Sequence, residues 1–295
     1  MNSFNINPFN LKSLKTRIDE SFSIKKNQQI KSLSSFNLKG NFNLSFIDKD
    51  QIDEIDIKNL KASCIIVNKK INIKNNIIIT KNPRLFFSKI CKIFIPNLFE
   101  DQFYEKNNHK NIRFGKNVLI SKKSKIGINS IICDNVIIYK NTYIGKNCYI
   151  GPGSIVGSEG IGRYKNKNKF ENMIHLGGVR IADKVRIGCN TVINKGTLNN
   201  TIIKKNTFIG NLVNIGHNAR IGENSIISNN SVISGGSTLR DNVEVGTGSI
   251  ISSKIKIGNQ CKVGAGSVVI KDVKSNQDVF GNPAKKIYFV KKNFI

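Results

Sequence analysis

His217 and Gly235 are two residues whose types and spacing could support chemistry on a polarised carbonyl group. His217 lies in the segment NIGHN, and an imidazole, which titrates near neutral pH, can act as a general base. Gly235 lies eighteen positions later in the segment SGGS. A backbone without a side chain leaves its N–H open to an oxygen that gains negative charge during a reaction. The chemistry requires the intervening chain to bring these two residues into adjacent layers.

A six-residue repeat predicts such a layered structure. Period six fits neither a helix nor a single strand, and it is typical of a hexapeptide parallel β-helix. Three hexads make one triangular coil of eighteen residues, so we expect between seven and eight coils, with His217 and Gly235 in neighbouring ones. Gly often follows the apolar residue, where it relieves crowding at the turn. The apolar positions are Phe114, Ile120, Ile126, Ile132, Ile138, Ile144, Ile150 and Val156, then Ile181, Ile187 and Ile193, then Ile203, Ile209, Ile215, Ile221, Ile227, Ile233, Leu239, Val245, Ile251, Ile257, Val263 and Val269.

The remaining histidines and the cysteines favour neither a metal site nor a cofactor. His109 falls in a polar linker, and His175 falls in a segment that breaks the repeat. Zinc chemistry on such a scaffold needs three converging histidines, so we predict no metal. The six cysteines form no CxxC pair and occupy mostly apolar positions, which indicates reduced core residues.

The composition of the chain limits which partners and which cellular compartment are expected. A formal charge of +28 suggests nucleic acid or an anionic membrane. However, Lys, Asn and Ile are used heavily even in loops, which is typical of biased base composition, and no Arg or aromatic cluster is evident. We therefore predict no nucleic acid, while an acidic protein partner remains open. No signal peptide or transmembrane run is evident, so we expect a cytoplasmic protein.

The chain divides into four predicted parts. Residues 1–35 are polar and weakly patterned, which predicts a loosely ordered lead-in. Residues 36–104 are predicted to form a small α/β domain. Three short strands are expected there, around residues 44–47, 64–67 and 77–80, followed by a helix that Asn82 caps and that ends before Pro96. Residues 105–273 form the β-helix, with a register-breaking loop at 158–178. Residues 274–295 read as a short basic tail.

Several segments resemble one family, the UDP-3-O-(3-hydroxyacyl)glucosamine N-acyltransferases of lipid A biosynthesis. The resemblance covers most of residues 40–285. The segments that carry it are NKGTLNNTII at 194–203, NLVNIGHN at 211–218, the loop between SEG at 158–160 and GG at 177–178, and SFI at 45–47 with NPRLFF at 82–87.

The resemblance implies a fold, a reaction and partners. The fold would be a left-handed parallel β-helix with a small amino-terminal α/β domain, assembled as a homotrimer with active sites between subunits. The reaction would transfer a 3-hydroxyacyl group from acyl carrier protein to the 2-amino group of UDP-3-O-acylglucosamine. The enzyme would be cytoplasmic, and peripheral association with the inner membrane fits that role.

The resemblance also implies roles for particular residues. His217 matches the general base and Gly235 the amide that binds the oxyanion, while Phe46 matches an aromatic that stacks on uracil. The remaining substrate-binding residues that it implies are Asn211, Asn214, Asn218 and Lys254. The sequence departs from the family at Lys49 and Ile52, where Asn and Tyr are usual, and at Lys254, where many members have a second histidine. The family's carboxy-terminal helices correspond here to the basic tail.

Two alternatives remain open. The same β-helix and histidine would serve sugar O-acyl or O-acetyl transfer, although the amino-terminal domain favours the N-acyltransferase. From a different class, the chain could be a non-catalytic solenoid that binds polyanions, as its charge suggests.

Overall fold

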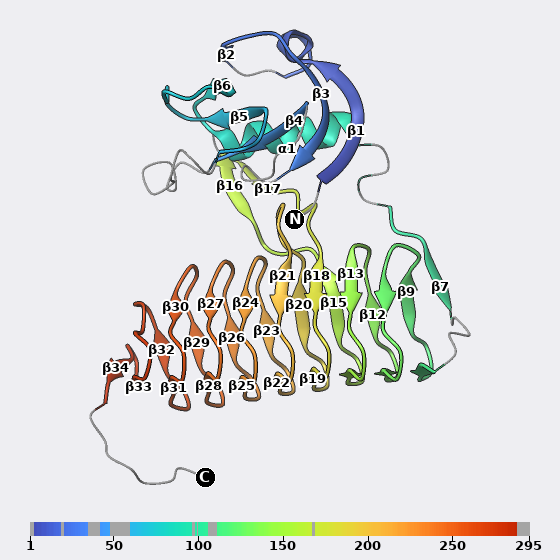
Figure 1. The fold of residues 1–295 in the computed structure, drawn as a ribbon, viewed down its shortest axis with the longest axis vertical. Helices are drawn as coiled ribbons and strands as arrows, with labels where there is room; N and C mark the ends of the chain where they lie inside the picture. The colour runs from blue at the N-terminus through green and yellow to red at the C-terminus, as the bar shows by residue number, and fades with distance from the viewer. Residues whose placement is uncertain are drawn as a thin grey trace. The chain divides into compact units, whose positions relative to one another are not determined.

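The computed structural model describes two compact units (Figure 1). Its described residues are 3–18, 21–34, 42–47, 60–95, 98, 100–105, 111–166 and 169–287. One unit comprises residues 1–100 and 161–176, and the other comprises residues 101–160 and 177–295.

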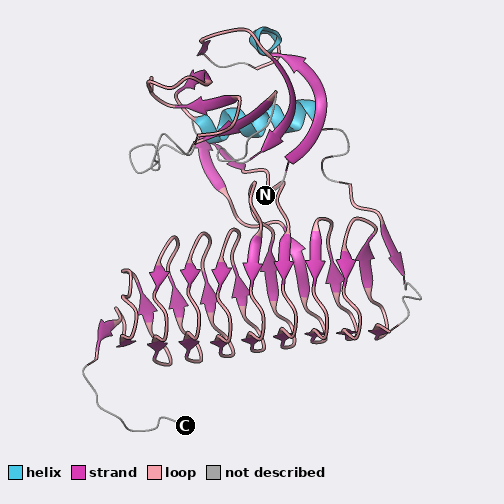
Figure 2. Ribbon diagram, viewed as in Figure 1, coloured by secondary structure: helices cyan, strands magenta, loops and turns pink. Residues whose placement is uncertain are grey.

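The second unit is a parallel β-helix with three flat sheets, which confirms the reading of the hexads (Figure 2). The seven-stranded sheet contains β10 (Lys125–Ile126), β13 (Thr142–Ile144), β18 (Val179–Ile181), β21 (Thr201–Ile203), β24 (Arg220–Ile221), β27 (Thr238–Leu239) and β30 (Lys256–Ile257). The nine-stranded sheet contains β7 (Phe103–Glu105), β9 (Leu119–Ser121), β12 (Ile137–Ile138), β15 (Ile155–Ser158), β20 (Val192–Asn194), β23 (Asn214–Ile215), β26 (Val232–Ile233), β29 (Ile250–Ile251) and β32 (Val268–Val269). The ten-stranded sheet contains β8 (Arg113–Phe114), β11 (Ile131–Ile132), β14 (Tyr149–Ile150), β19 (Arg186–Ile187), β22 (Phe208–Ile209), β25 (Ile226–Ile227), β28 (Glu244–Val245), β31 (Lys262–Val263), β33 (Asp278–Phe280) and β34 (Lys285–Lys286).

The apolar residue of each hexad points inward and builds one continuous core. Ile215 pairs with Ile193 and Ile233 in neighbouring coils, and all three side chains are fully buried. Each large aliphatic buried in this way contributes roughly 1.5–3 kcal/mol. The glycine after it is required by close stacking: a Cβ on Gly222 would lie 2.3 Å from the carbonyl carbon of Arg240 in the next coil.

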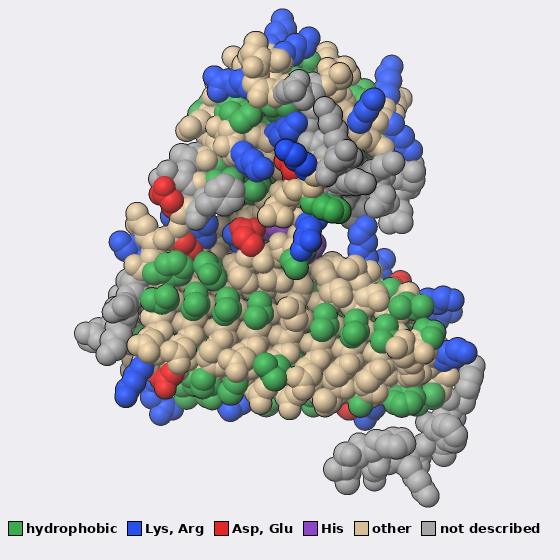
Figure 3. Space-filling model, turned by 180° about the vertical axis from the view of Figure 1, so that it is seen from behind, with side chains coloured by type: hydrophobic (Ala, Val, Ile, Leu, Met, Phe, Trp, Pro, Cys, Tyr) green, Lys and Arg blue, Asp and Glu red, His purple; other side chains and the backbone are tan. Residues whose placement is uncertain are grey.

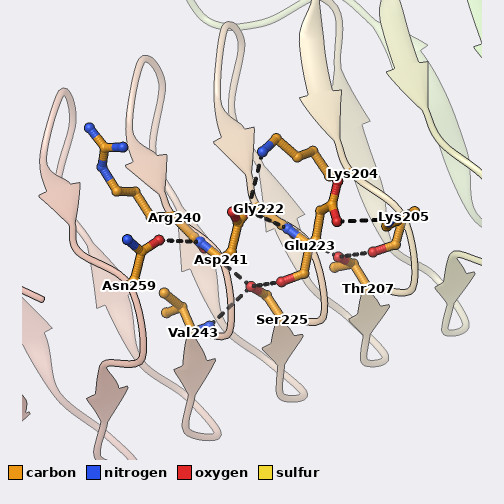
Figure 4. Close-up of polar contacts among 10 residues, drawn as sticks. All are labelled: Lys204, Lys205, Thr207, Gly222, Glu223, Ser225, Arg240, Asp241, Val243 and Asn259. Carbon is orange, nitrogen blue, oxygen red and sulfur yellow. Dashed lines mark hydrogen bonds and ion pairs between the residues drawn. The ribbon is translucent and has the colours of Figure 1, made fainter. Parts of the chain in front are cut away.

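The turns between sheets are fixed by polar ladders (Figure 4). The Asp241 carboxylate accepts the Glu223 N–H at 2.8 Å, and the Asn259 side chain accepts the Asp241 N–H at 3.1 Å. This contact with the Glu223 N–H is the main reason that the pKa of Asp241 is lowered. Many turns contain an asparagine in the left-handed region, such as Asn224 with φ 53° and Asn242 with φ 59°. Asparagine adopts this region more readily than most residues, so its abundance has a structural reason that the base-composition explanation missed.

The first unit is a six-stranded sheet with one helix. The strands are β1 (Ser3–Asn10), β2 (Phe22–Ile24), β3 (Gln29–Ser34), β4 (Asn43–Phe46), β5 (Cys64–Val67) and β6 (Asn76–Thr80), in the order β1-β3-β4-β5-β6-β2, with a 3-10 helix η1 (Leu11–Thr16). Helix α1 (Pro83–Phe94) begins as predicted, because the Asn82 side chain accepts the Leu85 N–H at 3.1 Å. The three predicted strands are confirmed as β4, β5 and β6.

Three predicted boundaries were wrong. Residues 1–35 are no lead-in, because they supply β1, β2 and β3, and Leu11, Leu14 and Ile30 there are fully buried. Within the loop at 158–178, residues 161–176 belong to the first unit and include β16 (Arg163–Asn166) and β17 (Lys169–Asn172). The β-helix runs past residue 273, because β33 and β34 extend the ten-stranded sheet.

Candidate active site

His217 lies in a turn between two of the three sheets. Strand β23 of the nine-stranded sheet ends at Ile215, and β24 of the seven-stranded sheet begins at Arg220. The imidazole is half-buried, so one part of the ring is held by the chain while another part can reach a substrate. The predicted outward projection from a corner of the repeat is therefore confirmed.

Asn218 fixes the orientation and the tautomer of this imidazole. Its side-chain oxygen accepts the Thr197 N–H at 3.0 Å and the Thr197 hydroxyl at 3.0 Å, so the oxygen cannot be exchanged with the amide nitrogen. The same oxygen lies 3.1 Å from Nδ1 of His217. Because this partner only accepts, Nδ1 carries the proton and Nε2 keeps its lone pair.

Gly235 lies directly against the basic nitrogen. A Cβ built on Gly235 would be 2.7 Å from Nε2 of His217 and 3.0 Å from each neighbouring ring carbon. Two backbone hydrogen bonds hold the coil of Gly235 between its neighbours. The Gly236 N–H donates to the His217 carbonyl at 2.8 Å, and the Lys254 N–H donates to the Gly235 carbonyl at 3.1 Å. Within the described residues no acceptor engages the Gly235 N–H. The imidazole Nε2 therefore packs against the backbone of Gly235.

Cationic side chains lie along the same row of turns. Lys195 is one coil before His217, because Ile193 pairs with Ile215, and its ammonium contacts the Glu159 carboxylate at 2.5 Å. The side chain of Lys195 is 8% exposed and that of Glu159 is 53% exposed, so the lysine is shielded from water while its partner faces solvent. Lys254 is exposed, and its Cγ lies 3.5 Å from the Cβ position of Gly236. Along the row, the imidazole thus lies between the ion pair of Lys195 with Glu159 on one side and the exposed Lys254 on the other.

The repeats match a known family model. Residues 123–158 and 200–235 match the bacterial transferase hexapeptide, which has six repeats. These segments identify the β-helix as one built of transferase hexapeptide repeats. The second matched segment contains both His217 and Gly235, so the stacked pair belongs to the repeat and not to an insertion.

Solved structures resemble this chain in fold. LpxA from Acinetobacter baumannii is 24% identical, with a TM-score of 0.55, and the match covers 61% of this chain and 68% of that one. UDP-N-acetylglucosamine acyltransferase from Campylobacter jejuni is 28% identical, with a TM-score of 0.50, and the match covers 61% of this chain and 71% of that one. No match was found among curated proteins. Repeat and fold together agree with the left-handed coil that the family resemblance implies.

The fold brings together some of the predicted site residues. His217, Gly235, Asn218 and Lys254 share one row of turns, and Asn214 is exposed on the strand that leads to His217. Asn218 was predicted to bind substrate, but its side chain is committed to the imidazole and to Thr197. Sequence reasoning missed this orienting contact, and it also missed Lys195.

Asn211 is not part of this constellation. It lies at a different turn, between β22 and β23, where its side-chain oxygen accepts the Cys189 N–H at 2.8 Å. Its own N–H donates to the Asn229 side chain at 2.8 Å. The side-chain oxygen of Asn211 is therefore part of a structural ladder, and the binding of substrate by Asn211 stays a prediction.

Phe46 belongs to the first unit. It is half-buried at the end of β4, and its ring centroid lies 4.8 Å from that of Phe87 on α1. The two departures from the family pattern, Lys49 and Ile52, lie outside the described residues.

The described part of the chain offers two further findings. None of its helices is long and apolar enough to cross a bilayer. Its His, Cys, Asp and Glu side chains form no group of three that could hold a metal ion.

Proposed function

We propose that this protein is an N-acyltransferase of lipid A biosynthesis. It would move a 3-hydroxyacyl group from acyl carrier protein to the 2-amino group of UDP-3-O-acylglucosamine. The observation that carries the proposal is the stack of Gly235 on Nε2 of His217. Further support comes from the structural similarity to an enzyme named as a UDP-N-acetylglucosamine acyltransferase and from the family resemblance of the flanking segments.

In this proposal, His217 and Gly235 supply the two functions that aminolysis of a thioester needs. The substrate amine attacks the thioester carbon while Nε2 of His217 takes the amine proton, an effect worth roughly 10²–10⁴ in rate. The Gly235 N–H donates to the oxygen that becomes negative, which is typically worth about 3–4 kcal/mol. When the C–S bond breaks, the thiolate leaves and takes the proton from His217. Asn218 acts as a positioning residue, because it keeps the proton on Nδ1 throughout.

The first unit supports the choice of acceptor. A simple sugar acetyltransferase on a β-helix needs no such module, whereas a nucleotide-linked acceptor benefits from one. Phe46 offers a half-buried aromatic surface that would stack on a uracil ring. Lys254, exposed in the row of His217, would attract an anionic group of the acceptor or the donor.

A trimer is part of the same proposal. The outward positions of the nine-stranded sheet form an apolar row, which Asn214 alone interrupts among the described parallel strands: Leu119, Ile137, Ile155, Val192, Val232, Ile250 and Val268. Figure 3 shows a face of this kind, where rows of hydrophobic side chains cross the β-helix with few charges among them. Contiguous apolar surface of this extent marks an interaction site. Packing this row against a second copy would turn the open turn of His217 into a cleft between subunits.

The compartment follows from the substrates. We place the reaction in the cytoplasm or at the inner face of the inner membrane. The described cysteines are all free thiols, and four of the six are buried, as expected for a reducing compartment.

O-acyl transfer is the second candidate, because the similar structure from Campylobacter jejuni is named for UDP-N-acetylglucosamine. One experiment separates the two. The purified protein is incubated with a series of 3-hydroxyacyl carriers and with either UDP-3-O-acylglucosamine or UDP-N-acetylglucosamine, and the products are identified by mass spectrometry. We expect an N-acylated product with the first acceptor only. Product from the second acceptor alone would establish O-transfer.

A non-catalytic polyanion-binding solenoid is the third possibility, and His217→Ala tests it. This variant should abolish transfer while leaving any polyanion binding intact. If the wild-type protein transfers no acyl group to either acceptor, the enzymatic proposal is wrong.

A further inference from the structure

The outer face of the seven-stranded sheet carries a regular series of cations. Its outward residues, in strand order, are Lys125, Tyr143, Arg180, Ile202, Arg220, Thr238 and Lys256. Every second strand therefore presents a Lys or Arg, and the strands between them present a neutral side chain. We call Lys125, Arg180, Arg220 and Lys256 the cation ladder.

The rigid β-helix fixes the spacing of the cation ladder. Neighbouring strands lie about 4.8 Å apart, so cations on alternate strands are about 9.6 Å apart and the ladder is about 29 Å long. Lys125, Arg220 and Lys256 are exposed, and Arg180 is half-exposed. Arg180 donates to the Asn141 carbonyl at 3.1 Å, and its guanidinium lies 5.9 Å from the Tyr143 ring centroid.

Among the described residues, ion pairs neutralise lysines on surfaces next to the cation ladder. At the adjacent turn, Lys204 and Lys205 pair with Asp241 and Glu223 at 3.2 and 3.3 Å (Figure 4). On the ten-stranded sheet, Lys262 pairs with Glu244 at 3.2 Å.

No such pair to the ladder is seen among the described residues, and the outward positions of all seven strands lack an acid. The row ends at Asp272, whose carboxylate accepts the Lys256 N–H at 2.8 Å. The face thus keeps its positive charge for an external partner.

The periodicity of the ladder fits an α-helix. An acidic residue every seven positions recurs at about 10.5 Å along a helix, within about 1 Å of the ladder spacing. The long Lys and Arg side chains absorb the remaining difference. Six strand spacings match a helix of about twenty residues laid along the axis of the β-helix. A single nucleic-acid strand fits less well, because the neutral positions offer one aromatic, Tyr143, where stacking platforms would be needed.

We propose that the cation ladder docks an acidic α-helix of the protein that carries the acyl thioester. This inference rests on the proposed function and adds the surface that receives the donor. His217 and Arg220 are separated by only two residues, so a helix seated on the ladder lies beside the turn that holds the imidazole. The group that carries the acyl thioester would then pass from the seven-stranded sheet directly to the adjoining turn of His217, without crossing either of the other two sheets.

The test compares two donors of the same acyl group, each assayed with the whole 295-residue chain. One donor is an acidic acyl carrier protein, and the other is the acyl-pantetheine thioester without a protein. The variant Arg220→Glu with Lys256→Glu reverses half of the ladder. The control Lys12→Glu with Lys15→Glu makes the same change in charge at exposed positions of the first unit.

We expect kcat/KM with the carrier to fall at least about 10-fold in the ladder variant, and its salt dependence to flatten. With acyl-pantetheine, the variant should remain within about twofold of the wild type, and the control should retain both activities. Equal losses with both donors, or no loss with either, would overturn the proposal. Circular dichroism and the oligomeric state verify that the variants fold.

Binding of the unacylated carrier, measured by fluorescence anisotropy, separates this inference from the enzymatic proposal. If the wild type transfers nothing from either donor, the proposed function fails, whereas ladder-dependent carrier binding would still support the docking surface. Failure of the carrier to bind, or binding that the ladder variant leaves unchanged, would refute it. Ladder-dependent binding of a 20-nucleotide RNA in place of the carrier would assign the face to nucleic acid.

Discussion

Substitution of Gly235 by alanine tests the stacked pair at the reactive turn most directly. The added methyl group would lie 2.7 Å from Nε2 of His217, whereas ordinary contact begins near 3.4 Å. The ring must therefore retreat by roughly 0.7 Å, or else the coil must open. Two backbone hydrogen bonds resist movement of the coil, so we expect the ring to rotate away and to weaken its 3.1 Å contact with Asn218.

The expected loss is in kcat. Displacement of a catalytic group by a distance of this order costs roughly 10²-fold, and KM should change little because no substrate contact is removed. The assay is steady-state transfer from 3-hydroxyacyl carrier to UDP-3-O-acylglucosamine. Gly248→Ala is the matched control, because that glycine also lies in a turn but has nothing within 4 Å of its Cβ position. Its positive φ of 70° should lower stability by about 1–2 kcal/mol without a change in kcat.

A double mutant makes the test decisive. In His217→Ala the imidazole is gone, so the methyl group at position 235 meets no ring. Gly235→Ala should then change the residual rate by less than about threefold, although it costs roughly 10²-fold in the wild type. If Gly235→Ala alone keeps kcat within threefold of the wild type, or if the losses of the two changes multiply, the stacked geometry does not carry the reaction.

Three other changes probe the surroundings of the site. Asn218→Ala should lower kcat about 10-fold or more by releasing the Nδ1 proton, and Asn218→Asp, which keeps the acceptor, should recover part of that loss in the same assay. Asp241→Asn should alter the acid unfolding profile: the lowered pKa of Asp241 means that its carboxylate stabilises the fold above the unfolded value of about 3.9 and loses this effect as the pH falls through the folded value. The variant keeps the acceptor oxygen, so it should be less sensitive to acid than the wild type, and an equally steep loss on thermal unfolding between pH 2 and 5 would contradict this. Val232→Glu puts a charge into the apolar row and should dissociate the trimer in sedimentation velocity with loss of transfer; an unchanged sedimentation coefficient would exclude this row from the interface.

The β-helix could be predicted because its main constraint is local and periodic. An apolar residue every six positions identifies the coil, and eighteen-residue coils place His217 beside Gly235 without any knowledge of tertiary structure. The helix cap at Asn82 is local in the same sense. Each of these features depends on residues that are close in sequence or in strict register, so a pattern is sufficient to find them.

Other features depend on departures from that register. The coil that links Ile193 to Ile215 has twenty-two residues instead of eighteen. The eighteen-residue repeat alone therefore did not show that Lys195 and Thr197 lie in the coil directly before the turn of His217. The amino-terminal strands were missed because Lys and Asn interrupt their apolar residues. Their core is completed by strands and a helix far along the chain, which no local window includes. The apolar residues Met173, Ile174 and Leu176, all buried, were the available signal that the loop packs as structure.

The fixed rise of the β-helix also limits how far each change can act. Every coil contacts only the coils before and after it, so the structure behaves as a nearly one-dimensional stack. The methyl group at position 235 therefore strains the layer of His217 but leaves Lys125 and Arg180, which lie four and two coils before that layer, in place. Carrier binding through the cation ladder should be almost unchanged in Gly235→Ala, while kcat falls. Loss of kcat without loss of carrier binding would then show that the reactive turn and the docking surface act independently. The same layer spacing sets the contact between Gly235 and the imidazole and the distance between the cations of the ladder.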